Sequence, residues 1–217
     1  MKVTTDACLF GAWCASEIQN LHCSSILDIG AGTGLLSLMI AQKNNGKIKA
    51  VEIDENAAHQ ANNNISNSPW KDRISLHHTD ILKHVGSYEC IVSNPPFYEN
   101  ELHSPHSRNN LAHHSTGLTL ANLIQYSETN LTNKGFMFLL LPFKRVDEVE
   151  RMLNFKSLFI YKKLLVQQST RHSPFRAMLM LGKQKIDPPT TGIISIKEGN
   201  VYTEDFKALL KDYYLYL

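Results

Sequence analysis

The stretch Ser25–Gly34, "SILDIGAGTG", begins as a short apolar run and ends with glycine at every second position. The run predicts a buried strand. The glycines predict a tight turn into a helix, because glycine tolerates positive φ and lets a ligand approach the backbone closely. The dinucleotide fingerprint G-x-G-x-x-G needs glycine at position 35, where this chain has Leu35. The stretch therefore predicts a ligand-binding strand–turn–helix unit that departs from the dinucleotide pattern.

Segments of strand length alternate with segments of helical periodicity along the chain. Strands are expected at 47–54, 73–80, 88–94, 135–142, 157–166 and 176–183, and helices at 35–43, 55–65, 118–131 and 146–153. Thr203 is expected to cap a last helix whose apolar stripe reaches Leu217. Such alternation predicts a mostly parallel sheet with helices on both faces, which binds ligands beyond the carboxyl ends of its strands.

Acidic residues end two of the expected strands at positions suited to a nucleoside. Glu52 follows Gly32 by twenty residues, a spacing at which a carboxylate can accept both ribose hydroxyls. Asp80 ends the next strand, where it can accept from an adenine amino group. NAD and S-adenosylmethionine sites share this spacing, so it does not separate them. A pyrophosphate needs amides aimed at it from a helix N-terminus, whereas S-adenosylmethionine needs only the tight turn.

The segment "SNPPF" ends the strand expected at 88–94. Pro95 and Pro96 must end that strand, because proline has no N–H and fixes its own φ. The Asn94 side-chain oxygen and the Pro95 carbonyl form two acceptors on a stiff backbone, and Phe97 can lie against a planar group. The segment therefore predicts a site for a planar substrate with an NH₂ group, whose nitrogen is made reactive by orientation and electrostatics.

"SNPPF" together with "DIGAGTG" resembles the class I methyltransferases that act on exocyclic or amide nitrogen, whose motif is [DNS]-P-P-[YFW]. The segments "MKVTTDACLFGAW", "SNPPFYENEL", "AHHSTGLTLANLI", "KGFMFLLLP" and "YTEDFKALLKDYYL" resemble the tRNA1(Val) adenine-N6 methyltransferase family over nearly the whole chain. The resemblance implies N6-methylation of adenosine-37, beside the anticodon, with S-adenosylmethionine as cofactor. It also implies a Rossmann-like α/β fold with a seven-stranded, mostly parallel sheet and helices on both faces.

The resemblance implies one methyltransferase domain over residues 1–217. Within it, 1–24 would cover the cofactor, 25–185 would form the core, and 186–217 would add a strand and a docking helix. The residues that would bind the cofactor are Lys2, Thr5, Asp6, Asp28, Gly30, Gly32, Gly34, Glu52 and Asp80. The residues that would hold the target base are Asn94, Pro95, Pro96 and Phe97.

The charge of the chain is unevenly distributed. The net charge is +2, but Leu141–Lys185 holds ten basic residues and three acids. A basic segment on a nearly neutral chain suggests a polyanionic partner, although lysines on solvent-facing surfaces would give the same count. The predicted RNA contacts in this segment are Lys144, Arg145, Lys162, Lys163, Arg171 and Arg176.

Other functions share some of these features. Enzymes that methylate a glutamine of a release factor or ribosomal protein use the same N-P-P-[YF] chemistry, as do other nucleic-acid adenine-N6 methyltransferases. A non-enzymatic nucleotide-binding module would show a degenerate glycine turn or a broken "NPPF", and both are intact here. No metal is expected, and the histidines of the 103–114 loop are interpreted as polar residues of a substrate loop.

The composition is that of an ordinary globular protein, with 43% hydrophobic and 19% charged residues among 217. The four cysteines form no C-x-x-C pair and are expected to be reduced thiols. Neither a signal peptide nor an apolar run of membrane-spanning length is found, so a cytoplasmic protein without a membrane partner is expected. We expect a monomer.

Overall fold

The computed structural model describes residues 3–96 and 118–216. The helices are α1 (Thr5–Leu21), α2 (Leu35–Lys43), α3 (Glu55–Ser66), α5 (Leu120–Asn130), α6 (Val146–Leu153) and α7 (Glu204–Leu210), with 3₁₀ turns η1 (Ile81–Lys83) and η3 (Phe143–Arg145). The strands are β1 (Ser25–Ile29), β2 (Lys47–Glu52), β3 (Ile74–His78), β4 (Tyr88–Ser93), β5 (Leu131–Pro142), β6 (Phe159–Ser169), β7 (Arg176–Gly182), β8 (Thr190–Glu198) and β9 (Val201–Tyr202). The predicted strands all exist, with ends that differ by at most four residues.

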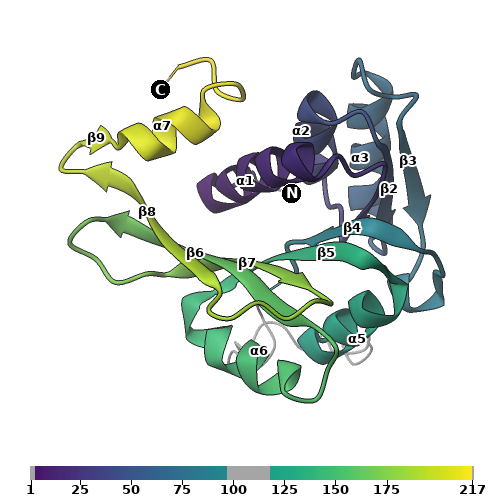
Figure 1. The fold of residues 1–217 in the computed structure, drawn as a ribbon. Coiled ribbons are helices and arrows are strands. Elements are labelled where there is room, and N and C mark those ends of the chain that lie inside the picture. The colour runs from purple at the N-terminus through teal and green to yellow at the C-terminus, as the bar shows by residue number, and fades with distance from the viewer. Residues whose placement is uncertain (1–2, 97–117, 217) are drawn as a thin grey trace, which may run out of the picture.

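All of these strands form one sheet in the order β3-β2-β1-β4-β5-β7-β6-β8-β9 (Figure 1). The pairs from β3 across to β5 are parallel, and β7 runs antiparallel to both of its neighbours. The predicted count of seven strands is therefore wrong. The chain after Lys185 adds two strands, β8 parallel to β6 and the short β9 antiparallel to β8.

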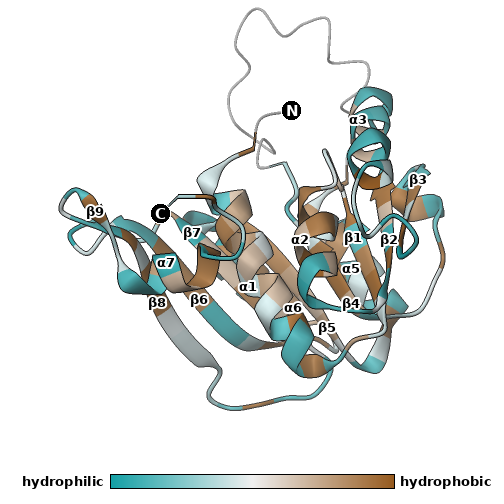
Figure 2. Cartoon of the chain, turned by 90° about the horizontal axis from the view of Figure 1, so that it is seen from above, coloured by the Kyte–Doolittle hydropathy of each residue, from teal (hydrophilic) through white to brown (hydrophobic). Residues whose placement is uncertain are grey.

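Helices cover both faces of the sheet, as the alternation predicted. Figure 1 shows α1, α2 and α3 on one face, with α7 beyond them, and α5 and α6 on the other. Two buried apolar clusters match these layers: one joins α1, α2, α3 and α7 to the sheet, and the other joins α5 and α6 to it. Mostly hydrophilic residues wind around the outer α3, whereas hydrophobic ones follow the central strands (Figure 2).

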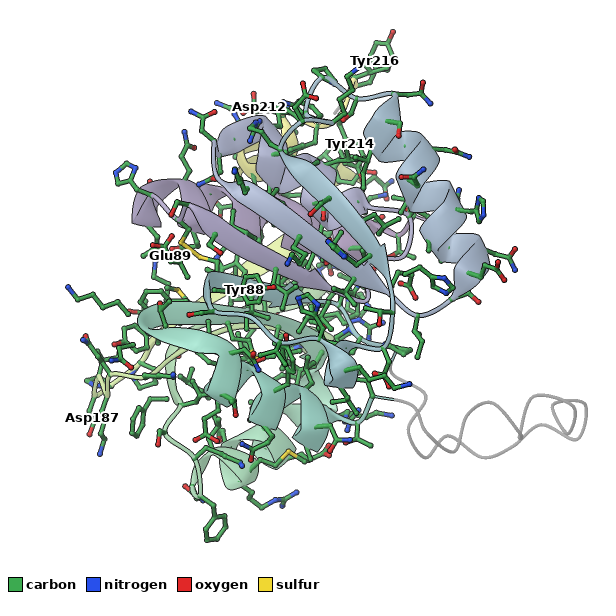
Figure 3. All side chains as sticks on the ribbon, turned by 90° about the vertical axis from the view of Figure 1, so that its right-hand side faces the viewer. Tyr88, Glu89, Asp187, Asp212, Tyr214 and Tyr216 are labelled. Carbon is green, nitrogen blue, oxygen red and sulfur yellow. A yellow bond between two sulfur atoms is a disulfide. The ribbon has the colours of Figure 1, made fainter. Side chains whose placement is uncertain are left out.

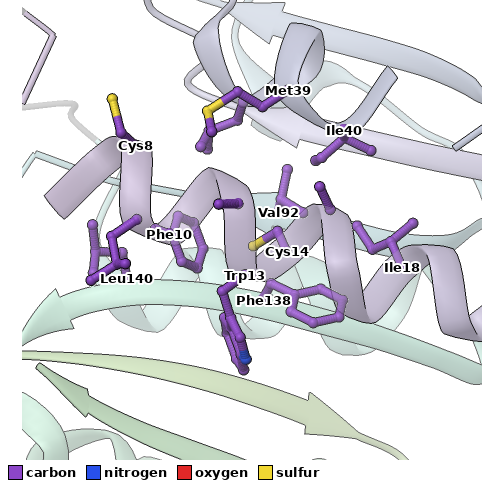
Figure 4. Close-up of a cluster of buried hydrophobic side chains, with 14 of the residues drawn as sticks. Cys8, Phe10, Trp13, Cys14, Ile18, Met39, Ile40, Val92, Phe138 and Leu140 are labelled. Carbon is purple, nitrogen blue, oxygen red and sulfur yellow. The ribbon is translucent and has the colours of Figure 1, made fainter. Parts of the chain in front are cut away.

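Helix α1 lies across the first face and is mostly core. Ten of its 17 residues are buried. Figure 4 shows Phe10, Trp13 and Cys14 on this helix between side chains of α2 and side chains of the sheet. The Trp13 ring meets the Phe138 ring of β5 edge-on, with 5.5 Å between centroids. Most of the segment predicted to cover the cofactor thus holds the domain together.

Two expectations about the chain fail in the structure. The last helix ends at Leu210 instead of continuing to Leu217, although Tyr213 still packs on the body and its hydroxyl donates to the carbonyl of Met39 at 3.2 Å. The prediction of four reduced thiols is wrong for two cysteines, because Cys23 and Cys90 are joined as a disulfide. Cys23 precedes β1 and Cys90 lies on β4, which is paired with β1, so the sheet brings them together. Cys8 and Cys14 are free and buried.

The docking of α7 yields a prediction about stability. Phe206 is 1% exposed, so Phe206→Ala would leave a cavity and should lower the free energy of unfolding by about 3–5 kcal/mol. Leu215→Ala is the control: Leu215 is 93% exposed, so the change should stay within about 0.5 kcal/mol. Urea unfolding at equilibrium measures both. Equal effects of the two variants would show that α7 contributes little to the core.

Candidate active site at the carboxyl edge of the sheet

The glycine turn follows β1 at the point where the strand order reverses. β1 lies between β2 and β4, so the next strands along the chain diverge to either side of it. Such a switch point is where open α/β sheets bind ligands. The N–H groups of Gly30 and Ala31 donate to the Val51 carbonyl at 2.9 and 3.1 Å, which ties the turn to β2.

The turn requires glycine at every second position. Gly30, Gly32 and Gly34 have φ of 71°, 57° and 81°, in the left-handed region. A Cβ added at Gly30 would have no neighbouring atom within 4 Å, so the backbone there faces open space. The turn therefore presents bare backbone to a space that side chains would otherwise fill, and this fits a bound ligand such as S-adenosylmethionine.

Glu52 is buried at the end of β2 and organises the turn. Its Oε2 accepts from the Gly32 N–H at 2.7 Å, and its Oε1 accepts from the N–H groups of Ile53 and Asp54, both at 2.9 Å. An ionised carboxylate has about four acceptor positions, so one is left for a ligand hydroxyl unless the Gly32 bond opens. The sequence predicted the position of Glu52 but not its bond to the turn.

Asp28 lies beneath the turn and is fully buried. Its Oδ2 accepts from the backbone N–H and the hydroxyl of Ser37, at 3.1 and 2.7 Å, so it holds the first turns of α2. Burial raises the pKa of Asp28 to about 6; the Ser37 hydrogen bonds lower that pKa and the charge of Glu52 raises it. Asp28 therefore holds the start of α2 directly after the turn, and its predicted contact with the cofactor stays a prediction. The sequence did not indicate Ser37, its partner.

Asp80 follows β3 at the carboxyl edge of the sheet. The N–H of Thr79, the residue before it, donates to the Glu52 carbonyl at 3.0 Å, which places the ends of β2 and β3 side by side. Its Oδ1 accepts from the Leu82 N–H at 2.9 Å and caps η1. Ile53, next to Glu52 in the chain, is 66% exposed and offers apolar surface that a planar ring can cover. The sequence prediction did not include Ile53, because a single exposed aliphatic residue gives no signal in the sequence.

Asn94 follows β4 on the other side of the switch point. The hydroxyl of the preceding Ser93, fully buried, donates to the Ile29 carbonyl at 2.9 Å and fixes this strand end beside the glycine turn. Asn94 and Pro95 are half-buried, and Pro96 is exposed. Within residues 3–96 and 118–216 the Asn94 amide makes no hydrogen bond. Phe97 lies outside the described residues.

Asp6, which was predicted to bind the cofactor, forms an ion pair with Arg176, which was predicted to contact RNA. Asp6 Oδ2 accepts from Arg176 Nε at 2.8 Å, which joins the first turn of α1 to the start of β7. Burial raises the pKa of Asp6, but hydrogen bonds from Thr4 and Arg176, and the charge of Arg176, outweigh burial and lower that pKa overall. Thr5 begins α1 and is exposed, and Lys2 lies outside the described residues.

The six predicted RNA contacts lie in two places. Lys144 and Arg145 follow β5, Arg171 lies between β6 and β7, and Arg176 begins β7, all at the carboxyl edge. Lys162 and Lys163 lie well inside β6 and point to opposite faces. Lys162 pairs with Glu17 of α1 at 2.7 Å and Lys163 with Glu150 of α6 at 2.5 Å. The structure therefore places four of the six at the carboxyl edge of the sheet and two inside β6.

A cavity of about 520 Å³ lies at the opposite edge of the sheet, lined by residues that include Lys47, Lys49 and Tyr88. It exists because the connection from β3 to β4 contains only the short η1, so no helix covers that part of the face. Tyr88 and Glu89, at the start of β4, are labelled in Figure 3. None of the predicted catalytic or cofactor residues lines this cavity.

The chain matches known methyltransferases along nearly its whole length. The sequence profile of the family described as "Methyltransferase small domain" matches residues 12–152. A tRNA1(Val) (adenine(37)-N6)-methyltransferase of Parabacteroides distasonis is 34% identical over an alignment of 220 positions, which covers 99% of this chain and 91% of that protein. The chain belongs to the family of tRNA1(Val) (adenine(37)-N6)-methyltransferases. Members of the same name from Shewanella sp. (strain MR-7) and Haemophilus influenzae (strain PittEE) are 36% and 37% identical, with 93% and 92% of their length covered.

Solved structures confirm the fold that the family implies. A protein described as a predicted O-methyltransferase, from Agrobacterium tumefaciens, has a TM-score of 0.70 at 16% identity, covering 94% of each chain. A ribosomal protein L11 methylase of Lactobacillus delbrueckii subsp. bulgaricus has a TM-score of 0.59 at 18% identity, covering 81% of this chain and 77% of that one. At these identities the likeness concerns the fold alone.

The residues that the structure describes contain no group of three or more His, Cys, Asp or Glu side chains placed to hold a metal ion. The histidines of the 103–114 loop lie outside them. None of the helices in residues 3–96 and 118–216 is both long and apolar enough to cross a membrane.

The double role of Glu52 yields a prediction about the cofactor. Glu52→Ala should weaken S-adenosylmethionine binding by roughly 1.5–3 kcal/mol, because it removes a charge-assisted acceptor and frees the Gly32 amide. Asp54→Ala is the control. Within the described residues the Asp54 side chain caps α3, accepting from the Ala57 N–H at 2.8 Å, and the Asp54 N–H that donates to Glu52 is kept in the variant, so cofactor affinity should not change. Isothermal titration with S-adenosylmethionine and with NAD measures this. Tight NAD binding, or a Glu52→Ala protein with normal affinity, would contradict the assignment.

Proposed function

We propose that this chain is an S-adenosylmethionine-dependent methyltransferase that methylates N6 of adenosine-37, next to the anticodon of tRNA1(Val). The observation that carries the proposal is the Asn94 amide, which makes no hydrogen bond within the described residues and follows β4 across the switch point from the glycine turn. The names of relatives 34–37% identical over the whole chain support the substrate.

The chain's own residues would bind and orient the substrate. When bound, S-adenosylmethionine supplies a methyl group on a positively charged sulfur. Glu52 and the glycine turn hold the nucleoside side of the site. Asn94 Oδ1 and the Pro95 carbonyl accept from the two hydrogens of the adenine amino group, which favours a pyramidal nitrogen with its lone pair directed at the methyl group. Positioning and fixed dipoles carry the chemistry, and no strong general base is needed.

The buried bond from Ser93 to Ile29 makes this positioning rigid. It joins Ser93, the residue before Asn94, to Ile29, the residue before Gly30. Asn94 and the glycine turn therefore follow directly from two adjacent, hydrogen-bonded strand ends. Pro95 and Pro96 then restrict the backbone that follows. The two halves of the site can therefore keep a constant separation, which a reaction that depends on orientation requires.

The basic residues at the carboxyl edge favour RNA over a protein glutamine as the substrate. Lys144, Arg145, Arg171 and Arg176 follow or precede strands that end beside the site. A polyphosphate backbone gains from several such cations at once. Methylation of a protein glutamine would need only the acceptor pair, so the basic residues would have no role in it.

Asn94 is the most direct test of the chemistry. The Asn94 side-chain oxygen is proposed to bind the adenine amino group most strongly when that group is positioned to attack the methyl group. Loss of this oxygen should therefore lower turnover more than binding. Asn94→Ala should reduce kcat by at least ~100-fold, about 2.7 kcal/mol, with the affinities for S-adenosylmethionine and tRNA nearly unchanged. Asn94→Asp keeps an acceptor and should retain more activity than the alanine variant. Single-turnover methylation of tRNA1(Val), followed by nucleoside mass spectrometry, measures both. A normal rate for Asn94→Ala would place the catalytic site elsewhere.

Arg171 tests the RNA surface. It is exposed, and within the described residues its side chain makes no ion pair. Arg171→Glu should weaken tRNA binding and lower the slope of log K against log salt by about 1–2, because a phosphate contact is replaced by repulsion. Lys185→Glu makes the same charge change beyond β7, at the opposite edge, and should leave the slope nearly unchanged. Equal effects would mean that RNA responds to net charge and makes no contact at the carboxyl edge.

A further inference from the structure

Phe143 is an exposed aromatic residue at the edge that carries the candidate site. β5 extends past its neighbour β4: Ser93 pairs with Leu139, and β5 continues through Pro142. At ~3.3 Å per residue, this extension rises about 10 Å above the end of β4. Phe143 follows it directly and so lies above the level of Asn94, one strand away.

The backbone at Phe143 is held on both sides. Its N–H donates to the Phe175 carbonyl at 3.1 Å, which anchors it to the start of β7. Arg145 donates to the two oxygens of Glu148 at 2.7 and 3.0 Å, which fixes the turn η3. Phe143 as a whole residue is nevertheless 38% exposed. A fixed backbone with an exposed ring is preorganised to receive a flat partner.

The surroundings of Phe143 suit a nucleic acid. Lys144 and Arg145 follow it in the chain, and Arg171 lies at the same edge. Arg176, beside Phe175, has its guanidinium carbon 5.5 Å from the centre of that ring. Aromatic rings among cations are the usual means of binding a single strand, because bases stack on the rings and phosphates meet the charges.

We propose that Phe143 forms a stacking subsite for the nucleobase next to the target adenosine. The inference rests on the proposed function and extends it, since it specifies how the flanking nucleotide is held. An adenine must leave the base stack to reach Asn94. Its neighbour then loses a stacking partner, and the exposed ring of Phe143, above the level of Asn94, takes the place of that partner.

Phe155 provides a matched control. Single exposed hydrophobic residues are common on protein surfaces, so exposure alone does not identify a site. Phe155 is 88% exposed, more than Phe143, but it lies between α6 and β6, at the opposite edge of the sheet. Any general effect of removing a surface phenylalanine should appear equally at both positions, whereas stacking on RNA should depend on Phe143 alone.

The experiment uses the full chain and tRNA1(Val) with 2-aminopurine replacing the base on either side of adenosine-37. Binding to the unaltered protein should quench the fluorescence at one of the two positions. Phe143→Ala and Phe143→Leu should abolish this quenching and raise the tRNA dissociation constant roughly 5- to 150-fold, the range for loss of one stacked base. Phe143→Trp should retain both, and Phe155→Ala should behave like the unaltered protein. S-adenosylmethionine affinity and melting temperature should be the same throughout.

The possible failures are distinguishable. If the unaltered protein methylates tRNA1(Val) but Phe143→Ala matches Phe155→Ala, the stacking subsite is wrong and the proposed function stands. If Phe143→Leu shows the same quenching and the same tRNA dissociation constant as the unaltered protein, the contact is apolar packing and not stacking. That result also overturns the stacking subsite. If the unaltered protein neither binds nor methylates tRNA1(Val), the proposed function and the subsite are both wrong.

Discussion

The pairing of β1 with β2 on one side and β4 on the other is the constraint on which the site depends. It aligns Ile29 with Val51 and with Ser93, so three strands end at the same level. The chain then leaves β1 through the glycine turn, which is tied back to β2 by the Val51 carbonyl and by the buried Glu52 carboxylate. The bond from Ser93 to the Ile29 carbonyl does the same for β4. The glycine turn and Asn94 thus come from segments about sixty residues apart in the chain that follow adjacent strands of the sheet.

The arrangement requires a rigid sheet, and α1 supplies much of that rigidity. Its apolar side chains fill the space between α2 and the middle of the sheet, where Trp13 and Phe138 meet. The same helix begins at the carboxyl edge, where Asp6 pairs with Arg176 of β7. Helix α1 therefore packs on one face of the sheet and also contacts its carboxyl edge.

The sequence predicted the local parts of the site better than the contacts between them. The glycine turn, Glu52 and Asn94 follow strands whose apolar runs are visible in the sequence, and their function needs particular residue types at fixed places. The bonds from Ser37 to Asp28 and from Gly32 to Glu52, and the pairing of Asp6 with Arg176, depend on how segments meet in space. Helix α1 is apolar on most of its surface, so it shows weak amphipathic periodicity. The resemblance implied one strand after residue 185, whereas the structure has two, and both β8 and β9 lie at a mixed, partly exposed margin of the sheet.

The ion pairs of the basic segment limit how RNA can be recognised. Among the described residues, three acids from outside Leu141–Lys185 pair with cations of that segment: Glu17 with Lys162, Asp6 with Arg176 and Glu128 with Lys156. These pairs lower the local excess of positive charge from seven to four. A phosphate near Arg176 must compete with Asp6, and one near Lys163 must compete with Glu150. Both pairs are partly exposed to solvent, and such pairs contribute little to stability, so a phosphate can replace one partner at low cost. With a net charge of only +2, long-range attraction is weak as well. The proposed RNA recognition would therefore depend on shape and on contacts at the carboxyl edge, where Phe143 and Arg171 lie.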